Sequence, residues 1–218
     1  MRQPYDLSLE MNRLRFDNFR SPFAVLAFVG TCLLGLGLDL STKVWAFRRL
    51  DMMSDDVYQL IPGWLHFQTT INQGAVFGIG QGQRWLFVCV SMLAIAFLSW
   101  LFVSSERRQI GYHILLGMLL AGVLGNLYDR IMFGHVRDMI HALPGQRFSG
   151  TWQLPLFGYP PPDRQVFPYI FNVADTLLCT GVFLMIVYSF FHKPAATKEG
   201  ASEHDSNATP SSSKAVSS

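Results

Sequence analysis

Charged residues are scarce in this sequence. Asp, Glu, Lys and Arg make up 15% of its 218 residues, whereas half of the residues are hydrophobic, a balance typical of membrane proteins. The net charge is only +2 at pH 7, and no basic run with interleaved aromatic residues occurs. We therefore predict no nucleic-acid partner.

Metal-ligand and disulfide patterns are also missing. The three cysteines, Cys32, Cys89 and Cys179, lie inside apolar runs and form no CxxC pair, so we interpret them as small buried hydrophobic residues. The histidines have no HExxH-like spacing. We expect neither a metal site nor a cofactor.

Four apolar segments are long enough to span a bilayer, which takes roughly 20 apolar residues in a helix. They cover residues 21–38, 85–105, 110–128 and 166–191, and the first can extend through Leu40. We predict an all-α membrane protein with four transmembrane helices. A small extracytoplasmic β-rich region comes from the loop between helices 1 and 2, and a second large loop joins helices 3 and 4.

The distribution of arginines favours an orientation. Four spans place both termini on one side, and Arg107 and Arg108 in the shortest loop favour the cytoplasm for that side. Residues 1–20 are then a cytoplasmic N-terminal lead, 21–192 a transmembrane domain and 193–218 a cytoplasmic tail. The tail has almost no large apolar residues, so we expect it to be disordered.

Small residues recur in the third span at Gly117, Ala121 and Gly125. This spacing puts them on one helix face, where they allow another helix to approach closely. We interpret the stripe as a helix-packing surface.

Two aspartates, Asp138 and Asp175, lie beside apolar runs at the same predicted membrane face. A carboxylate near hydrocarbon costs at least a few kcal/mol and is usually functional. Two such groups brought together can share a proton and perform acid–base chemistry. Asp175 follows Asn172 by three residues, which also fits a plain helix start with Asn172 as N-cap. That placement would suit Asp175 as a base whose partner Asp138 carries the proton.

Polar residues also gather at the end of the third span. Asn126, Asp129 and Arg130 have the i, i+3, i+4 spacing of one helix face. Arg130 can stabilise a carboxylate or hold a lipid phosphate, although an interfacial ion pair that ends the span explains the same pattern.

Two further motifs flank the first large loop. Asn72 and Gly74 belong to a glycine-rich run that either grips a peptide backbone or forms an ordinary turn. Asp39 and Lys43 have i, i+4 spacing, and we interpret them as a structural ion pair.

Taken in order, these motifs resemble the lipoprotein signal peptidase (signal peptidase II) family over residues 38–187. The matches are Asp39 with Lys43, Asn-x-Gly-Ala-x-Phe-Gly at 72–78, Gly-Asn-x-x-Asp-Arg at 125–130 and Phe-Asn-x-Ala-Asp at 171–175. The resemblance implies a bacterial inner-membrane aspartic endopeptidase. Such an enzyme cleaves the signal peptide of a prolipoprotein just before a cysteine that already carries a diacylglyceryl group.

The resemblance also implies roles for individual residues. Asp138 and Asp175 become the catalytic dyad, near the extracytoplasmic face. The implied substrate-binding or supporting residues are Asn72, Asn126, Arg130, Asn172, Asp39, Lys43, Gly74, Asp129 and Ala174. The implied partners are a lipid-modified prolipoprotein and membrane lipid, and a monomer suffices because one chain holds both aspartates. The alternative is a non-catalytic four-span protein that binds lipid or lipoprotein.

Two features depart from the family pattern. Arg137 stands before Asp138, where the family usually has an apolar residue. We expect this cation either to lower the pKa of Asp138 or to point to lipid headgroups. The stretch 146–164, with three consecutive prolines, is longer than the pattern predicts.

Overall fold

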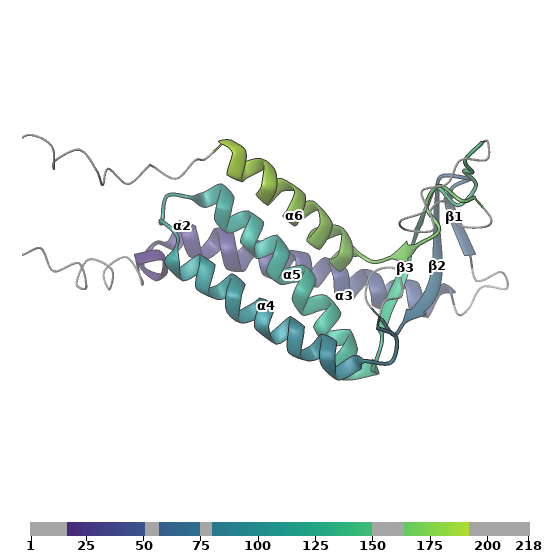
Figure 1. Ribbon diagram of the computed structural model, residues 1–218, viewed down its shortest axis with the longest axis horizontal. Coiled ribbons are helices and arrows are strands. Elements are labelled where there is room, and N and C mark those ends of the chain that lie inside the picture. Colours follow the sequence, from purple (N-terminus) through teal and green to yellow (C-terminus); the bar gives the residue numbers. More distant parts are fainter. Residues whose placement is uncertain (1–16, 51–56, 75–79, 150–163, 192–218) are drawn as a thin grey trace, which may run out of the picture.

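Four long helices and a small sheet at one end of them form the fold (Figure 1). The computed structural model describes residues 17–50, 57–74, 80–149 and 164–191, so the predicted tail and nearly all of the predicted lead lie outside the described residues. Among the described residues, four helices are long and apolar enough to cross a membrane: Pro22–Leu50, Arg84–Ser104 (α4), Ile110–Phe133 (α5) and Val173–Phe191 (α6). The prediction of four apolar helices of spanning length is confirmed.

The first of these helices is longer than predicted. After the short turn η1 (Asp17–Arg20) it comprises α2 (Pro22–Val25), the π-helical turn η2 (Leu26–Gly30) and α3 (Thr31–Leu50). The prediction that it ends near residue 40 was wrong, because Asp39 and Lys43 are buried polar residues within the helix rather than markers of its end.

The other helix bounds follow from local chemistry. α6 begins at Val173 rather than at residue 166, because residues 170–171 form a strand and Asn172 caps the helix. α5 continues past residue 128 to Phe133 and ends at Gly134, whose positive φ of 82° suits glycine.

The sheet combines strands from both large loops. Its order is β1 (Val57–Ile61), β2 (Leu65–Asn72), β3 (Val136–Ala142) and β4 (Ile170–Phe171), and every neighbouring pair is antiparallel. The strands predicted in the first loop are confirmed, and the second loop adds two more. The β2–β3 register pairs Thr70 with Asp138, so this aspartate lies directly opposite Thr70 in the sheet.

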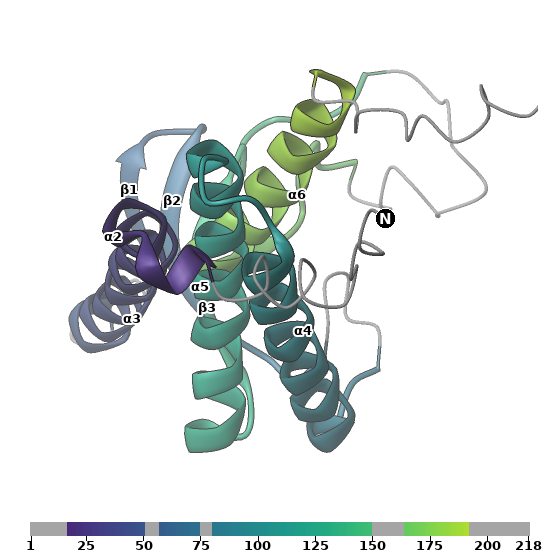
Figure 2. The same cartoon turned by 90° about the vertical axis from the view of Figure 1, so that its left-hand side faces the viewer.

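Helix α5 lies at the centre and packs against α3, α4 and α6 (Figure 2). Its stripe of small residues faces the first helix: a Cβ at Gly117 would lie 2.5 Å from the backbone oxygen of Phe28, and Ala121 lies against Gly35. At the third position a Cβ on Gly125 would clash with the Asp39 carboxylate. The predicted packing surface is therefore confirmed, and it sets how closely the helix bearing Asp39 approaches α5.

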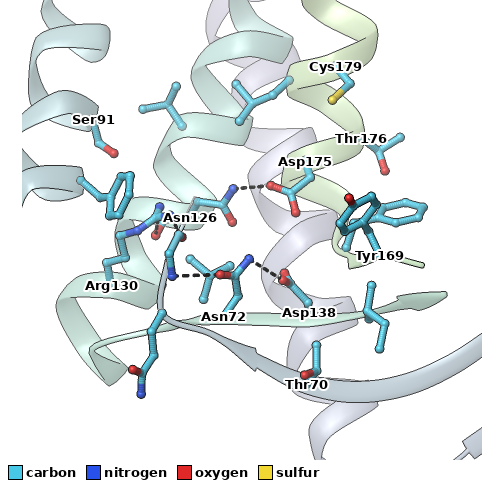
Figure 3. Close-up of a pocket in the computed structure, with 18 of the residues that line it drawn as sticks. Thr70, Asn72, Ser91, Asn126, Arg130, Asp138, Tyr169, Asp175, Thr176 and Cys179 are labelled. Carbon is cyan, nitrogen blue, oxygen red and sulfur yellow. Dashed lines mark hydrogen bonds between the residues drawn. The ribbon is translucent and has the colours of Figure 1, made fainter. Parts of the chain in front are cut away.

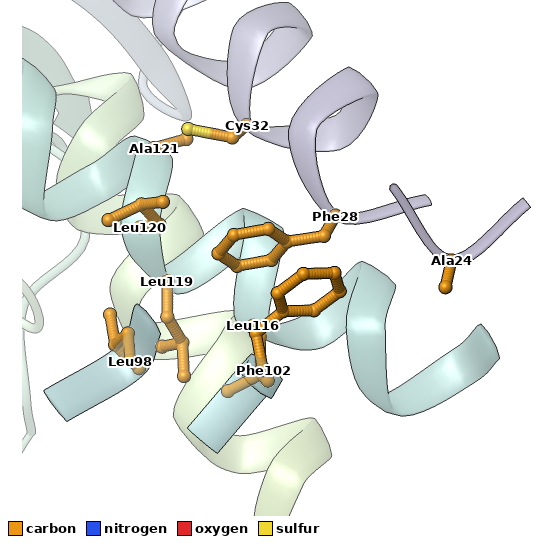
Figure 4. Packing of buried hydrophobic residues seen from close by; sticks show 9 residues of the cluster. All are labelled: Ala24, Phe28, Cys32, Leu98, Phe102, Leu116, Leu119, Leu120 and Ala121. Carbon is orange, nitrogen blue, oxygen red and sulfur yellow. The ribbon is translucent and has the colours of Figure 1, made fainter. Parts of the chain in front are cut away.

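A compact apolar cluster holds the end of the bundle opposite the sheet (Figure 4). Phe28 and Phe102 stack with ring centroids 4.3 Å apart. Asn18 donates to the backbone oxygens of Phe102 and Ser105, which ties the start of the first helix to the end of α4. This contact places η1 beside the short 105–109 loop.

The cysteines differ from one another in environment. Cys32 belongs to the buried cluster, but Cys89 and Cys179 are exposed on α4 and α6. The interpretation of all three as buried residues was therefore wrong for two of them, because these two helices turn most of their surface away from the protein.

Gly117→Ala is expected to lower the stability of the folded state by about 1–3 kcal/mol, because the added methyl group has no space beside the Phe28 backbone. The measurement is thermal unfolding in detergent. Gly37→Ala is the matched control, since nothing lies within 4 Å of its added Cβ. Equal melting temperatures for the two variants would contradict this packing argument.

Candidate active site

Asn172 organises the start of α6. Its side-chain oxygen accepts a hydrogen bond from the Asp175 backbone N–H at 2.9 Å, and its own N–H donates to Asp175 Oδ2 at 3.3 Å. This reciprocal arrangement is that of a capping box. The predicted N-cap is confirmed, and the cap fixes Asp175 in the first turn of α6.

Asp138 reaches the same place from the sheet. Both oxygens of its carboxylate accept hydrogen bonds from amides: Asn172 Nδ2 donates to Oδ1 at 2.6 Å, and Asn72 Nδ2 donates to Oδ2 at 3.1 Å. The side-chain oxygen of Asn72 in turn accepts from the Gly74 N–H at 2.9 Å. Asn72 therefore links the end of β2 to Asp138.

Asn126 on α5 contacts Asp175 directly (Figure 3) and is linked to Asp138 through Asn172. Its Nδ2 donates to Asp175 Oδ1 at 2.8 Å, and its Oδ1 accepts from Asn172 Nδ2 at 3.2 Å. Because Asn172 also holds Asp138, a continuous chain of amide hydrogen bonds runs from one aspartate to the other.

Asp138 is only 1% exposed, and this burial dominates its electrostatics. Burial, and then the charge of Asp175, raise the pKa of Asp138 to about 7, although the hydrogen bonds from Asn72 and Asn172 and the charge of Lys43 act in the opposite direction. The two carboxylates are thus near enough to couple, and Asp138 keeps its proton up to near-neutral pH.

A buried ion-pair cluster lies directly behind these amides. Lys43 Nζ lies 2.7 Å from Asp39 Oδ2 and 3.2 Å from Asp129 Oδ2, which confirms the predicted pairing of Asp39 with Lys43. Lys43 also donates to Asn126 Oδ1 at 3.3 Å, and Asp39 accepts from the Ala174 N–H at 2.8 Å. The cluster therefore binds α3 to α5 and α6 at the level of the two aspartates.

Arg130 holds the chain that follows β2. Its Nη2 donates to the Gly74 carbonyl at 3.1 Å and its Nη1 to the Asn126 carbonyl at 3.4 Å, while its guanidinium lies 4.9 Å from the Phe87 ring centroid. Within the described part of the chain it forms no ion pair with Asp138 or Asp175. These contacts give Arg130 a structural role in the site. Its predicted role, to stabilise a carboxylate or hold a lipid phosphate, stays a prediction.

The two aspartates line a cavity of about 820 Å³ bounded by α4, α5, α6 and the sheet. Its wall on α4 includes Val90, Ser91 and Ala94, and its wall on α6 includes Leu178 and Cys179. Figure 3 shows Asp138 and Asp175 near one another in this cavity, with Ser91 and Cys179 farther along the helices. Two carboxylates therefore meet at one end of a largely apolar cavity. No trio of His, Cys, Asp or Glu among the described residues could hold a metal ion.

The sequence matches the family described as Signal peptidase (SPase) II over residues 31–191. The chain belongs to this signal peptidase II family. It is 37% identical over 167 residues to a lipoprotein signal peptidase of Rhodopirellula baltica, covering 75% of this chain and 71% of the relative. A lipoprotein signal peptidase of Clostridium tetani is 33% identical over 72% of this chain and 87% of its own length.

Solved structures share the fold of this chain. One described as a bacterial membrane enzyme, determined by the in meso method at 2.3 Å resolution, has a TM-score of 0.61 and 26% sequence identity. The match covers 78% of this chain and 92% of the solved one. The chain is therefore a multi-pass membrane peptidase of the signal peptidase II type, and the non-catalytic alternative is not favoured.

The expectation that Arg137 points to lipid headgroups was wrong. Its side chain points neither to lipid nor to Asp138 but is buried and bonded to Asp129. The pKa of Asp138 is raised by burial and by the charge of Asp175, so any lowering by Arg137 is smaller than these two effects. Successive side chains of a strand point to opposite faces, so the position of Arg137 in β3 turns it away from Asp138. That alternation was the signal in the sequence that could have indicated its direction.

Other residues of the site were not found from the sequence. The cavity lining includes Thr70, Tyr169, Ser91, Thr176 and Cys179, none of which belongs to a recognised motif. Thr70 could have been identified only through the β2–β3 register, because its contact with the site depends on lying opposite Asp138.

Asn172→Ala is expected to lower stability by about 0.5–2 kcal/mol through loss of the N-cap, and to impair peptidase activity through loss of its contacts with Asp138 and Asn126. Asn172→Ser is the control, because serine keeps the cap but is too short to hold the other two side chains. Thermal melting and cleavage assays should show that serine restores stability but not activity. Full activity in both variants would contradict the role of Asn172 in the amide network.

Proposed function

We propose that this chain is an aspartic endopeptidase that removes the signal peptide from diacylglyceryl-modified prolipoproteins and cuts before the lipidated cysteine. Asp138 and Asp175 are its catalytic dyad. The observation that carries the proposal is the meeting of these two carboxylates, coupled and held by amides, in a cavity between membrane helices. The name of the relatives, lipoprotein signal peptidase, supports the substrate class.

The division of labour follows from the environment of the dyad. Asp138, whose pKa is about 7, carries the proton and donates it to the oxygen of the scissile carbonyl. Asp175 takes a proton from the attacking water, and the two carboxyl groups exchange these roles when the amine leaves. The amides of Asn72, Asn126 and Asn172 keep both carboxylates oriented throughout, and they do so as neutral donors.

The cavity supports a substrate that approaches from the bilayer. Its walls on α4 and α6 are mostly apolar along the helices, while the dyad lies at the sheet end. Apolar segments of a lipid-modified peptide gain about 0.8 kcal/mol for each buried CH₂ group. The signal helix and acyl chains would therefore supply binding energy while the scissile bond lies at the dyad.

The same arrangement supports the predicted orientation in a bacterial inner membrane. The sheet and dyad lie at one end of the helices, and the 105–109 loop with Arg107 and Arg108 lies at the other. With these arginines in the cytoplasm, both termini are cytoplasmic and the dyad lies near the extracytoplasmic face. Residues 21–192 act as one peptidase domain, and a monomer contains the full dyad.

Asp138→Asn and Asp175→Asn are each expected to abolish cleavage of a diacylglyceryl-modified prolipoprotein, because either change removes a group that must exchange a proton. A gel-shift assay with purified protein in detergent measures this, and circular dichroism tests the fold of each variant. Unmodified prolipoprotein serves as the substrate control and should remain uncut. Near-normal cleavage by either folded variant would rule out the dyad.

The pH dependence of kcat/KM, which reports the substrate-free enzyme, has a predicted sign. The pKa of Asp138 is raised from its ordinary value to about 7, so the proton that it must donate is present below this pH and is lost above it. Activity should therefore decline as pH rises through about 7 under conditions in which the protein stays folded. A rate that increases steadily across this range would show that the dyad does not work through a protonated Asp138.

A further inference from the structure

We propose that Arg137 is a positioning residue for the dyad. Through its ion pair with Asp129, it fixes β3 at the residue before Asp138 and balances the buried charges behind the dyad. The proposal rests on the proposed catalytic roles of Asp138 and Asp175. Arg137 is also the residue at which this chain departs from the family pattern.

The contacts of Arg137 form a clamp on one carboxylate. Its backbone N–H donates to Asp129 Oδ2 at 2.9 Å, while Nε and Nη2 donate to Asp129 Oδ1 at 3.2 and 2.8 Å. Asp129 belongs to α5, and Arg137 is the immediate neighbour of Asp138 in β3. The clamp therefore fixes the position of β3 along α5. It does so one residue before Asp138, which must lie near Asp175.

The surroundings of the guanidinium suit arginine alone among the basic side chains. Arg137 is 8% exposed, and its guanidinium carbon lies 4.3 Å from the Phe133 ring centroid and 5.9 Å from that of Phe47. These two rings come from α5 and α3. A planar guanidinium can stack on them while it donates through a fork, whereas the ammonium of lysine cannot do both.

The same ion pair completes a balanced charge cluster. Asp39, Lys43, Asp129 and Arg137 comprise two acids and two bases, and each is buried. Without Arg137, Lys43 alone would face two carboxylates, and the cluster would hold one uncompensated negative charge. This surplus charge would change the electrostatic potential at the dyad, because Lys43 contacts Asn126, which in turn donates to Asp175.

The charged groups around the dyad determine whether the loss of Arg137 makes the dyad harder or easier to deprotonate. Asp138 faces Asp175 on α6, and it interacts with Lys43 on α3 and Arg130 on α5. The charge of Arg130 acts through space on Asp129 and on both members of the dyad. The charge of Asp39 acts likewise on Lys43 and Asp129. Added negative charge at Asp129 therefore makes the dyad harder to deprotonate, and added positive charge makes it easier.

The test compares pH profiles of kcat for four proteins: wild type, Arg137→Gln, Asp129→Asn and the double variant. Removal of the arginine should move the profile to higher pH by about half a unit to one unit. Asp129→Asn leaves Arg137 unbalanced and should move the profile to lower pH. In the double variant the remaining Asp39–Lys43 pair is neutral, so its profile should return toward that of wild type.

Opposite shifts with recovery in the double variant would support the proposal, because loss of packing alone cannot give shifts of opposite sign. Unshifted profiles, or shifts in the same direction for both single variants, would overturn it. If Arg137→Gln does not fold, Arg137→Lys keeps the charge but not the fork. A lower kcat with an unshifted profile then supports the clamp, whereas wild-type kcat and KM overturn it.

The same assay separates this inference from the proposed function. A folded wild-type protein that does not cut lipid-modified prolipoprotein, or an active Asp138→Asn variant, sinks the proposed function. Cleavage by wild type that is lost in Asp138→Asn, together with a wild-type profile in Arg137→Gln, sinks only the role of Arg137.

Discussion

One buried lysine constrains the arrangement of three helices. Lys43 is fully buried, and an ammonium group in such an environment costs several kcal/mol unless it is paired and hydrogen-bonded. Its partners are Asp39 one turn earlier in the same helix and Asp129 and Asn126 on α5. Since Asp39 also accepts from a backbone N–H at the start of α6, the helices must meet at this level. Gly125 on α5 has no side chain, and this leaves the space that the Asp39 carboxylate occupies between the helices.

The site separates full charges from the dyad by a layer of amides. Asn126 accepts from Lys43 with its oxygen and donates to Asp175 with its nitrogen, so it transmits an orientation without placing the ammonium on the carboxylate. A cation in direct contact would hold a carboxylate ionised. Neutral donors leave burial and the charge of the second carboxylate as the main influences on the pKa of Asp138, and both raise it.

The sequence predicted those features that depend on local spacing. Four apolar runs, the cap at Asn172 and the i, i+4 pair of Asp39 and Lys43 each follow from neighbours within one or two turns of helix, and each is confirmed. The positions of Asp138 and Asp175 relative to each other were not predictable in this way, since they depend on strand pairing across long loops.

The errors have the same physical origin. The first span was predicted to end near residue 40, before Lys43, but partners on another helix make the burial of this charged residue within the helix tolerable. Likewise, the direction of Arg137 was judged from its neighbour in sequence, whereas its partner Asp129 lies on another element. Local patterns do not contain these long-range pairings, which decide where a polar side chain can be buried.

Burial connects the fold to the proposed chemistry. Helices α4 and α6 both pack on α5, and the cavity that opens between them leads to the dyad beneath the sheet. In the proposed reaction, an apolar substrate segment that fills this cavity displaces water from beside the carboxylates and lowers the local dielectric further. Desolvation already has the largest effect on the pKa of Asp138, so substrate binding would strengthen its hold on the proton until the carbonyl oxygen is in place to accept it. The placement of an acid–base pair at the end of an apolar cavity thus makes the substrate itself part of the environment that keeps the acid protonated.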